Sequence, residues 1–157
     1  MNKTNAMRQL DKAGVKYECI EYEVDESDLS GMHISEQTGT DPDIMFKTLV
    51  AKGEKNGYLV FCIPVNAELD LKECAVAAKD KRVELIAVKD LLSITGYIRG
   101  GCSPIGMKKN FPLFIDESAI LYEKITVSAG MRGCQLLLNR AELLEFTKAN
   151  VVDIIKI

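Results

Sequence analysis

The chain has 157 residues, 47% hydrophobic and 27% charged, which is the balance of one globular domain with its own core. Its formal net charge of −3 speaks against a general nucleic-acid binder, so any contact with a nucleic acid must rest on local positive charge and no DNA partner is expected. No apolar run reaches the ~18 residues of a membrane span, and the N-terminus lacks the apolar segment of a signal peptide, so we expect a cytoplasmic protein without a membrane partner.

Cysteine and histidine usage excludes the commonest metal and disulfide frameworks. The cysteines form no C-x-x-C pair, and their odd count and irregular spacing argue against disulfides and against a zinc site. The only histidine is His33, which cannot by itself supply a His-rich site. We therefore expect neither a metal nor a cofactor. The scattered cysteines are Cys19, Cys62, Cys74, Cys102 and Cys134.

In the first half of the chain, apolar residues recur first at helical spacing and then alternate as in strands. Glycine marks the expected end of each helix, and a glycine-bounded loop indicates a hairpin. The pattern predicts, in chain order, a helix over residues 4–13, a strand over 15–24, a short helix over 30–38, and hairpin strands over 44–51 and 58–65.

In the rest of the chain, Asp70 with Glu73 and Asn139 with Glu142 have the spacing of capping boxes, which predicts helices over 70–78 and from 139 to about 149. Because strands outnumber long helices, we expect a single α+β (mixed α/β) domain over residues 1–157, with a curved mixed sheet and helices packed on it. The remaining expected elements are short strands over 83–88, 113–115, 125–128, 135–138 and 151–157, a helical turn over 89–94 and a glycine-rich connection over 96–109.

Lys47 lies within the apolar strand expected over residues 44–51. Because strand side chains alternate, Lys47 shares a face with Met45 and Leu49, and the opposite face is also mostly apolar. A buried lysine is unfavourable unless it has a partner or a chemical task. The pattern alone favours a lysine that reaches the rim of the sheet, and a functional lysine is the second interpretation.

Two segments could bring the backbone close to a ligand. Residues 95–106 hold four glycines, and residues 127–133 end a strand in small residues with one cation. The first segment matches neither the P-loop nor the G-x-G-x-x-G pattern, so a long structural turn is the alternative. Cys102 lies in this segment, but no base accompanies it, so we do not expect it to be a nucleophile.

Taken together, these segments resemble the YbaK family of Cys-tRNA(Pro) deacylases, within the prolyl-tRNA editing-domain superfamily. The Gly-Gly-x-Ser-Pro form resembles the cysteine-directed members more than the alanine-directed ones. The resemblance rests on Pro42-Asp43, Phe46-Lys47-Thr48-Leu49, Leu69-Asp70-Leu71-Lys72, Thr95-Gly96-Tyr97, Gly100-Gly101, Ser103-Pro104, Gly106, Lys108-Lys109, Val127-Ser128, Gly130 and Arg132-Gly133.

The resemblance implies a YbaK-like fold and a trans-editing hydrolase that releases cysteine from Cys-tRNA(Pro), with Cys-tRNA(Cys) as a further substrate. In such enzymes the substrate's own thiol attacks its ester carbonyl. The implied partners are aminoacylated tRNA and, as a candidate, prolyl-tRNA synthetase. A non-catalytic module that binds the acceptor end or the synthetase is the alternative, and a deacylase for another amino acid such as alanine is a third interpretation.

Carried over by position, the resemblance implies Lys47 as the essential cation. Gln135 departs from the pattern, because some relatives carry an acidic residue there that could orient the substrate's ammonium, whereas glutamine offers a neutral acceptor. Ser30 departs too, since relatives carry an aromatic residue near Gly31. The implied substrate-binding residues are Tyr22, Ser30, Thr48, Gly100 and Gly101 as backbone donors, Ser103, Ser128, Gly130, Arg132 and Gln135.

Overall fold

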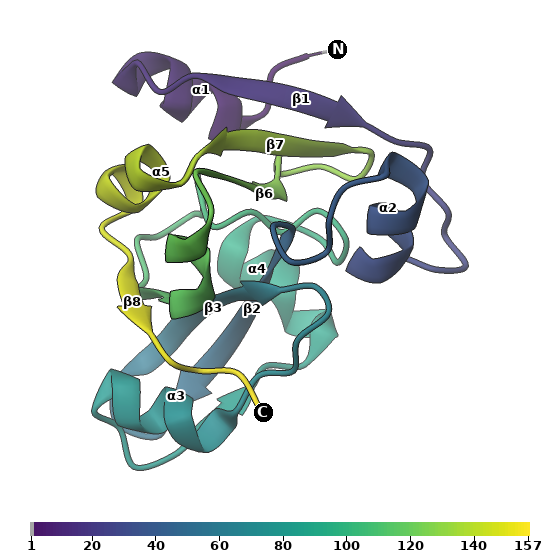
Figure 1. The fold of residues 1–157 in the computed structure, drawn as a ribbon. Helices are drawn as coiled ribbons and strands as arrows, with labels where there is room; N and C mark the ends of the chain where they lie inside the picture. Colours follow the sequence, from purple (N-terminus) through teal and green to yellow (C-terminus); the bar gives the residue numbers. More distant parts are fainter. Residues whose placement is uncertain (1) are drawn as a thin grey trace.

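Two β-sheets form the centre of the computed structural model, which describes residues 2–157 (Figure 1). An antiparallel sheet has the strand order β1-β7-β6, and a mixed sheet has the order β4-β2-β3-β5-β8. A parallel bridge between Met45 and Thr126 joins the two sheets at the start of β2. The expected α+β fold with a mixed sheet is confirmed, and its strands divide into these two sheets.

Short helices surround the sheets, and each strand is brief. The helices are α1 (Asn5–Ala13), α2 (Gly31–Thr38), α3 (Leu71–Ala78), α4 (Leu91–Thr95) and α5 (Arg140–Thr147), with 3-10 helices η1 (Val88–Asp90) and η2 (Glu117–Leu121). The strands are β1 (Tyr17–Glu21), β2 (Phe46–Gly53), β3 (Gly57–Pro64), β4 (Val83–Leu85), β5 (Leu113–Asp116), β6 (Lys124–Ser128), β7 (Cys134–Asn139) and β8 (Asn150–Val152). Among the described residues, no helix is long and apolar enough to cross a membrane.

Side-chain caps fix where four of the helices begin, and the sequence indicates two of them, Asp70 and Asn139. Thr4, Ser30, Asp70 and Asn139 each accept a hydrogen bond from a backbone N–H in the first turn of the helix that follows. The second half of the expected capping box does not form at Asp70, because its own N–H donates to the Ile154 carbonyl at 2.8 Å. This bond ties α3 to the C-terminal segment.

Three expected strands are shorter than the pattern indicates. The strand expected over 15–24 pairs only from Tyr17 to Glu21. The strand expected over 83–88 ends at Leu85, and the chain then turns into η1. The strand expected over 151–157 is β8, and beyond it a single bridge from Ile155 to Leu69 is all that continues the pairing. Beyond each of the first two strands a single backbone hydrogen bond continues the pairing, from Tyr22 N–H to the Gly133 carbonyl and from Ile86 N–H to the Val50 carbonyl.

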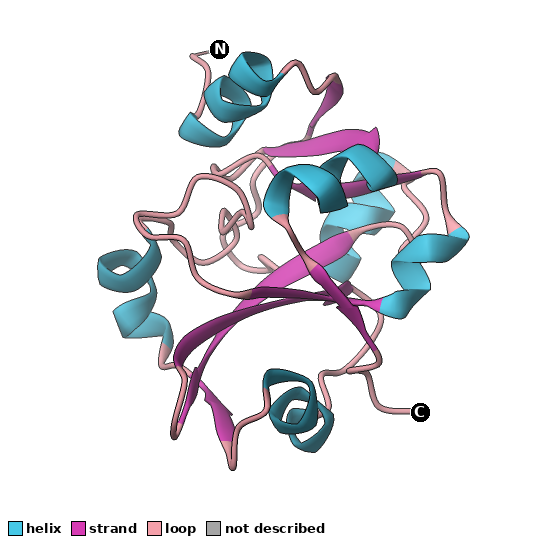
Figure 2. Ribbon diagram, turned by 90° about the vertical axis from the view of Figure 1, so that its left-hand side faces the viewer, coloured by secondary structure: helices cyan, strands magenta, loops and turns pink. Residues whose placement is uncertain are grey.

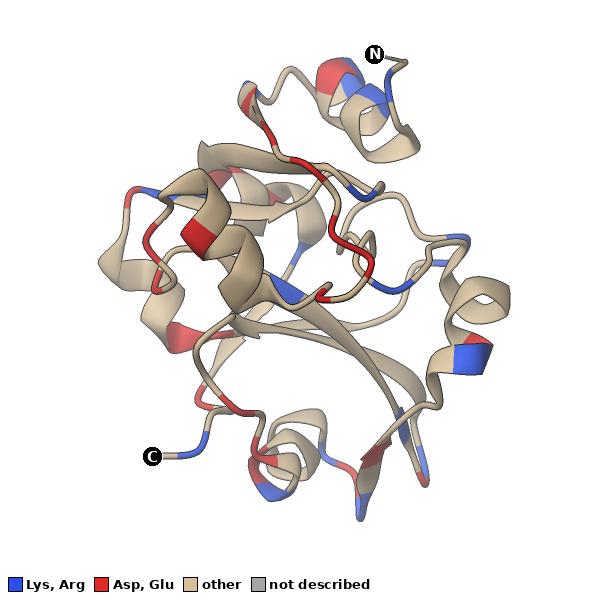
Figure 3. Ribbon diagram, turned by 90° about the vertical axis from the view of Figure 1, so that its right-hand side faces the viewer, with Lys and Arg blue, Asp and Glu red and all other residues tan. Residues whose placement is uncertain are grey.

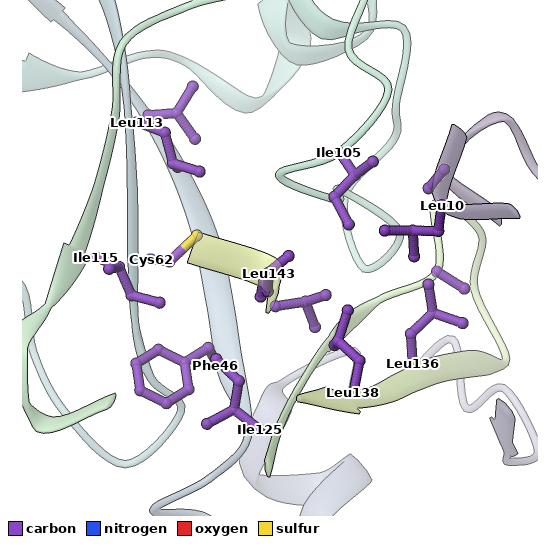
Figure 4. Close-up of a cluster of buried hydrophobic side chains, with 14 of the residues drawn as sticks. Leu10, Phe46, Cys62, Ile105, Leu113, Ile115, Ile125, Leu136, Leu138 and Leu143 are labelled. Atoms are coloured by element: carbon purple, nitrogen blue, oxygen red, sulfur yellow. The ribbon is translucent and has the colours of Figure 1, made fainter. Parts of the chain in front are cut away.

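The largest core cluster lies between the two sheets and is closed by α1 and α5 (Figure 4). Phe46 and Cys62 enter it from the mixed sheet, and Leu136 and Leu138 enter from the antiparallel sheet. A second cluster lies under α3, which covers the other face of the mixed sheet (Figure 2). In this cluster the rings of Phe61 and Phe114 stack with centroids 5.2 Å apart. Both faces of β2 are therefore apolar along most of its length.

Candidate functional site

A cavity of about 390 Å³ opens between α2, β2, η1 and the glycine-rich loop. Its volume lies within the range of about 300–1,000 Å³ that small-molecule sites occupy. Six of the eleven expected site residues line it, namely Lys47, Ser30, Thr48, Gly100, Ser128 and Gln135. These residues come from five segments far apart in the sequence, so the fold alone brings them together.

The cavity exists because β2 is an open edge over part of its length. β3 pairs with β2 from Phe46 to Gly53, whereas β4 pairs only with the last three residues of β2. Val65 N–H donates to the Met45 carbonyl, so the odd-numbered residues of β2 exchange main-chain hydrogen bonds with β3. The N–H and C=O groups of the even-numbered residues therefore point away from β3. The N–H and C=O of Thr48 consequently face the cavity side and have no strand partner within residues 2–157.

Lys47 is half-buried on the wall of this cavity, where it pairs across the sheet with Ile63. Burial lowers the pKa of Lys47 below its ordinary value, and the negative charge of Glu68 opposes that shift. Within residues 2–157, Lys47 forms no ion pair within 4.0 Å. A partly desolvated ammonium without a partner is thus presented to the cavity, which is the functional interpretation of this lysine.

Thr48 joins the cavity to the core beneath it. Its hydroxyl Oγ1 lies 3.5 Å from Cys62 Sγ, directly across the hairpin. Burial raises the pKa of the Cys62 thiol to about 12, so the thiol keeps its proton and can donate it to Oγ1. In that arrangement the hydroxyl proton of Thr48 is free to be donated to a ligand.

The two glycine-bearing segments, residues 95–106 and 127–133, pack closely against each other, and this packing positions the part of the cavity wall that they form. A Cβ on Gly101 would lie 3.1 Å from the Arg132 backbone nitrogen, and a Cβ on Gly130 would lie 2.9 Å from the Tyr97 ring. Gly130 also has φ +94°, a conformation that side chains rarely adopt. Arg132 Nε donates to the Arg99 carbonyl at 2.8 Å, which fastens the same two segments together.

Five of the expected site residues lie outside the cavity wall. Gly101 donates its N–H to Ile98 at 2.9 Å, so this N–H is not offered to the cavity as expected. Ser103 is fully buried, and its Oγ accepts from Ile105 N–H within its own loop. Tyr22 packs in the small cluster behind α2, while Gly130 and Arg132 hold the loops together as described above.

Ser30 lines the cavity but also begins α2, because its Oγ accepts the His33 N–H at 3.3 Å. The imidazole of His33 contacts two carboxylates of the preceding loop, with Nε2 3.1 Å from Asp25 and Nδ1 3.9 Å from Asp28. The same loop continues into Leu29 on the cavity wall. His33 therefore has a structural role in holding the loop against α2.

Sequence reasoning missed one cation and the apolar wall. Arg99 lies at the exposed rim of the cavity, and Leu85, Val88 and Leu91 form a wall that begins at the last residue of β4. Their only sequence signal is position, since Arg99 precedes the paired glycines and the apolar residues follow a strand. The contribution of the segment after β4 could be found only from the fold.

The charge distribution favours an anionic or ester-containing ligand. Lys47 and Arg99 are the cations of the cavity wall, and no acidic residue lines it among the described residues. Acidic side chains gather instead along the end of β1 and the loop that follows (Figure 3). Local positive charge therefore exists in a chain whose net charge is −3. No group of three or more metal-ligating side chains gathers anywhere in residues 2–157.

Cys102 is the only thiol on the cavity wall, counted over residues 2–157. Burial raises its pKa to about 12, with a further contribution from the nearby Cys62. At neutral pH it is therefore a protonated thiol, which is a poor nucleophile. The arrangement supplies hydrogen-bond donors and positive charge but no activated nucleophile.

Comparison with known proteins places this geometry in context. The sequence matches the family described as the aminoacyl-tRNA editing domain over residues 33–146. It is 47% identical over 152 residues to a protein of Enterococcus faecalis, EbsC, by name a candidate Cys-tRNA(Pro)/Cys-tRNA(Cys) deacylase, covering 97% of this chain and 93% of that protein.

Two solved structures share the fold at low sequence identity. A candidate trans-editing enzyme for prolyl-tRNA synthetase superposes with a TM-score of 0.84 at 22% identity, covering 99% of each chain. The hypothetical protein APE2540 superposes with a TM-score of 0.88 at 20% identity, covering 98% of this chain and 100% of the other.

Gly130→Ala should destabilise the protein more than Gly39→Ala. Both glycines have positive φ, which an alanine would adopt at roughly 1–2 kcal/mol, but only at Gly130 would the new methyl group meet another side chain. We expect that contact to add roughly 1–3 kcal/mol. Urea unfolding of the two variants measures the difference, and equal losses would show that the approach to Tyr97 has no energetic consequence.

Cys102 should resist alkylation at neutral pH. Iodoacetamide reacts with thiolates, and the protonated Cys102 thiol offers almost none, whereas Cys19 is exposed. Peptide mapping by mass spectrometry should find Cys19 modified first and Cys102 modified only at high pH. Rapid labelling of Cys102 in a Cys19→Ser variant at pH 7 would contradict its assignment as an unreactive thiol.

Proposed function

The chain belongs to the aminoacyl-tRNA editing domain family, and we propose that it hydrolyses the ester bond of Cys-tRNA(Pro), with Cys-tRNA(Cys) as a second substrate. The observation that carries the proposal is the unpaired, half-buried Lys47 on a cavity wall that bears no reactive nucleophile. The relative that is 47% identical supports cysteine as the amino acid.

In the proposed reaction the substrate supplies its own nucleophile. The cysteine thiolate attacks its ester carbonyl, a sulfur–carbon bond forms, and the carbon–oxygen bond to the ribose breaks. The ribose oxygen takes up the proton that the thiol lost, and the cyclic thioester that leaves is opened later by water. This scheme requires no protein nucleophile, consistent with the protonated state of Cys102.

The protein's part is orientation and charge stabilisation. Lys47 would place its ammonium beside the oxygen on which negative charge develops, in a partly desolvated setting where such an interaction is stronger than in water. The Thr48 hydroxyl and main chain would hold the neighbouring atoms of the ester or ribose. Gly100 would approach the same atoms through its backbone, and Arg99 would meet a phosphate at the rim.

Capture of tRNA would depend on a helper. The net charge of −3 and the acidic loop after β1 oppose the binding of a polyanion, while only two cations of the described chain line the cavity. Prolyl-tRNA synthetase is the proposed partner, because it already holds the tRNA that carries the wrong amino acid. Its effect can be read by repeating the hydrolysis assay below in its presence.

The purified protein should release labelled cysteine from Cys-tRNA(Pro) and leave Ala-tRNA(Pro) and Ser-tRNA(Pro) intact, because neither alanine nor serine has a thiol. Rates above the uncatalysed hydrolysis of each substrate give the comparison. Equal hydrolysis of the alanyl ester would replace thiol attack by water attack. Binding of all three without release would make the protein a non-catalytic acceptor-end module.

Lys47→Met should lower the rate of cysteine release by roughly 10²–10³-fold, the range found when a group that stabilises developing charge is removed. The melting temperature should stay equal or rise, because an unpaired and partly buried charge is replaced by an apolar side chain.

Lys52→Met is the matched control, since Lys52 lies on the same strand but outside the cavity wall, 5.5 Å from the centre of the Tyr58 ring. It should retain wild-type activity. Loss of folding in Lys47→Met, or an equal loss of activity in both variants, would make Lys47 a structural residue.

A further inference from the structure

Gln135 is a buried polar residue on the cavity wall, with only 5% of its surface exposed. It lies on β7 opposite Ser128 of β6, and Thr126 lies diagonally from it on the same face. The other face of these strands carries the apolar side chains of the main core. The antiparallel sheet thus turns a row of three polar side chains, all at most 7% exposed, towards the cavity side.

One end of the Gln135 amide is already occupied. The hydroxyl of Thr126 donates to Gln135 Oε1 at 3.3 Å. If the amide were turned round, Nε2 would donate to Oγ1 and the hydroxyl proton of the fully buried Thr126 would lose the only side-chain acceptor it has among residues 2–157. An unsatisfied buried donor of this kind destabilises a protein by about 1–3 kcal/mol. The orientation with Oε1 towards Thr126 is therefore the stable one.

The other end of the amide is free. Within residues 2–157, Nε2 of Gln135 has no hydrogen-bond partner, and it is not among the fully enclosed polar atoms. Its two protons are therefore available at the cavity wall.

Ser128 also has a hydrogen-bond donor that is free for a ligand. Its Oγ accepts the Gly130 N–H at 3.2 Å, so its own hydroxyl proton remains to be donated. Residues directly opposite each other on antiparallel strands have Cβ atoms about 4.5–5.5 Å apart. Ser128 and Gln135 consequently place two donors side by side on the cavity wall.

We propose that Gln135 binds an acceptor oxygen of the substrate, the ester carbonyl or a ribose oxygen, by donating from Nε2 together with Ser128, and that it does not bind the substrate's ammonium. This inference rests on the proposed deacylase function and deepens it. It reverses the role expected from the sequence, in which Gln135 replaces an acidic residue as a neutral acceptor. The acceptor oxygen of Gln135 is instead held by Thr126.

The decisive substitution is Gln135→Glu, which keeps the shape of the side chain and the acceptor for Thr126 but replaces the donor with a negative charge. kcat/KM for Cys-tRNA(Pro) should fall by roughly tenfold or more, since loss of one hydrogen bond and its replacement by repulsion exceed about 1.4 kcal/mol together. If Gln135 bound the ammonium, the carboxylate would bind it better, and activity equal to or above wild type would overturn the proposal.

Two further measurements separate this role from a structural one. The deficit of Gln135→Glu relative to wild type should shrink as the pH falls towards the pKa of the introduced carboxyl group, because the protonated group can donate again. A deficit that stays constant with pH would contradict donation. Gln135→Leu carries no charge, so it still tests whether the side chain contributes if Gln135→Glu fails to fold, and full activity in Gln135→Leu would overturn the proposal.

The control is Gln9→Glu, which makes the same change of charge at an exposed glutamine of α1 outside the cavity wall and should keep wild-type activity. Failure of the two proposals can be told apart by the wild-type protein. A folded wild-type protein that releases no cysteine overturns the deacylase itself. A wild-type protein that releases cysteine, with Gln135→Glu at least as active, overturns only the role of Gln135.

Discussion

The incomplete pairing of β2 is the constraint on which the site depends. An interior strand normally uses all its main-chain N–H and C=O groups in hydrogen bonds to its two neighbours. On this side of β2, however, β4 pairs only with Ala51 to Gly53. Ile86 N–H still pairs with the Val50 carbonyl at 3.1 Å before the chain leaves the sheet for η1. That departure opens the edge beside Thr48 and gives the cavity its apolar wall. Had the strand after Arg82 continued to residue 88 as its apolar pattern suggests, β4 would fill the space that the cavity occupies.

The open edge also explains why a lysine is tolerated within so apolar a strand. Lys47 extends from a face shared with Leu49 and packed under α3, yet it reaches a cavity rather than the core. Partial burial still destabilises its charged form, and Glu68 offsets this only in part. An apolar side chain at position 47 would stabilise the fold more than a lysine without an ion pair. Binding of a ligand therefore explains this charge more readily than a structural role does.

The sequence predicted the helices better than the strands, for physical reasons. Helix ends are fixed locally, by caps such as Thr4 and Asn139 and by glycines with positive φ such as Gly14, so a short window of sequence holds the signal. Strand ends depend on a partner, as the early stop of β4 shows. The site divides in the same way. Lys47 was noticed from the strand it lies in and Thr48 from the family resemblance, whereas Arg99 and the apolar wall at the end of β4 come from segments that only tertiary packing brings near. The glycines at 101 and 130 were noticed for ligand binding, but the close approach they permit is to other segments of the chain.

The chemistry of the cavity also suggests how so small a site could select one amino acid. Cysteine, serine and alanine differ by about one heavy atom, and a pocket that judges size alone separates such side chains by only about 1–3 kcal/mol. The chain carries five cysteines, yet Cys62 and Cys102 near the site are held as neutral thiols by burial, which raises the pKa of each to about 12. A protein nucleophile would attack every ester that entered, whereas a site that only orients and stabilises charge leaves the attack to a substrate that brings its own thiol. Selectivity for cysteine would then come from the reactivity of the substrate's thiol and not from the shape of the pocket. A cavity that offers hydrogen-bond donors but no nucleophile would favour this selectivity.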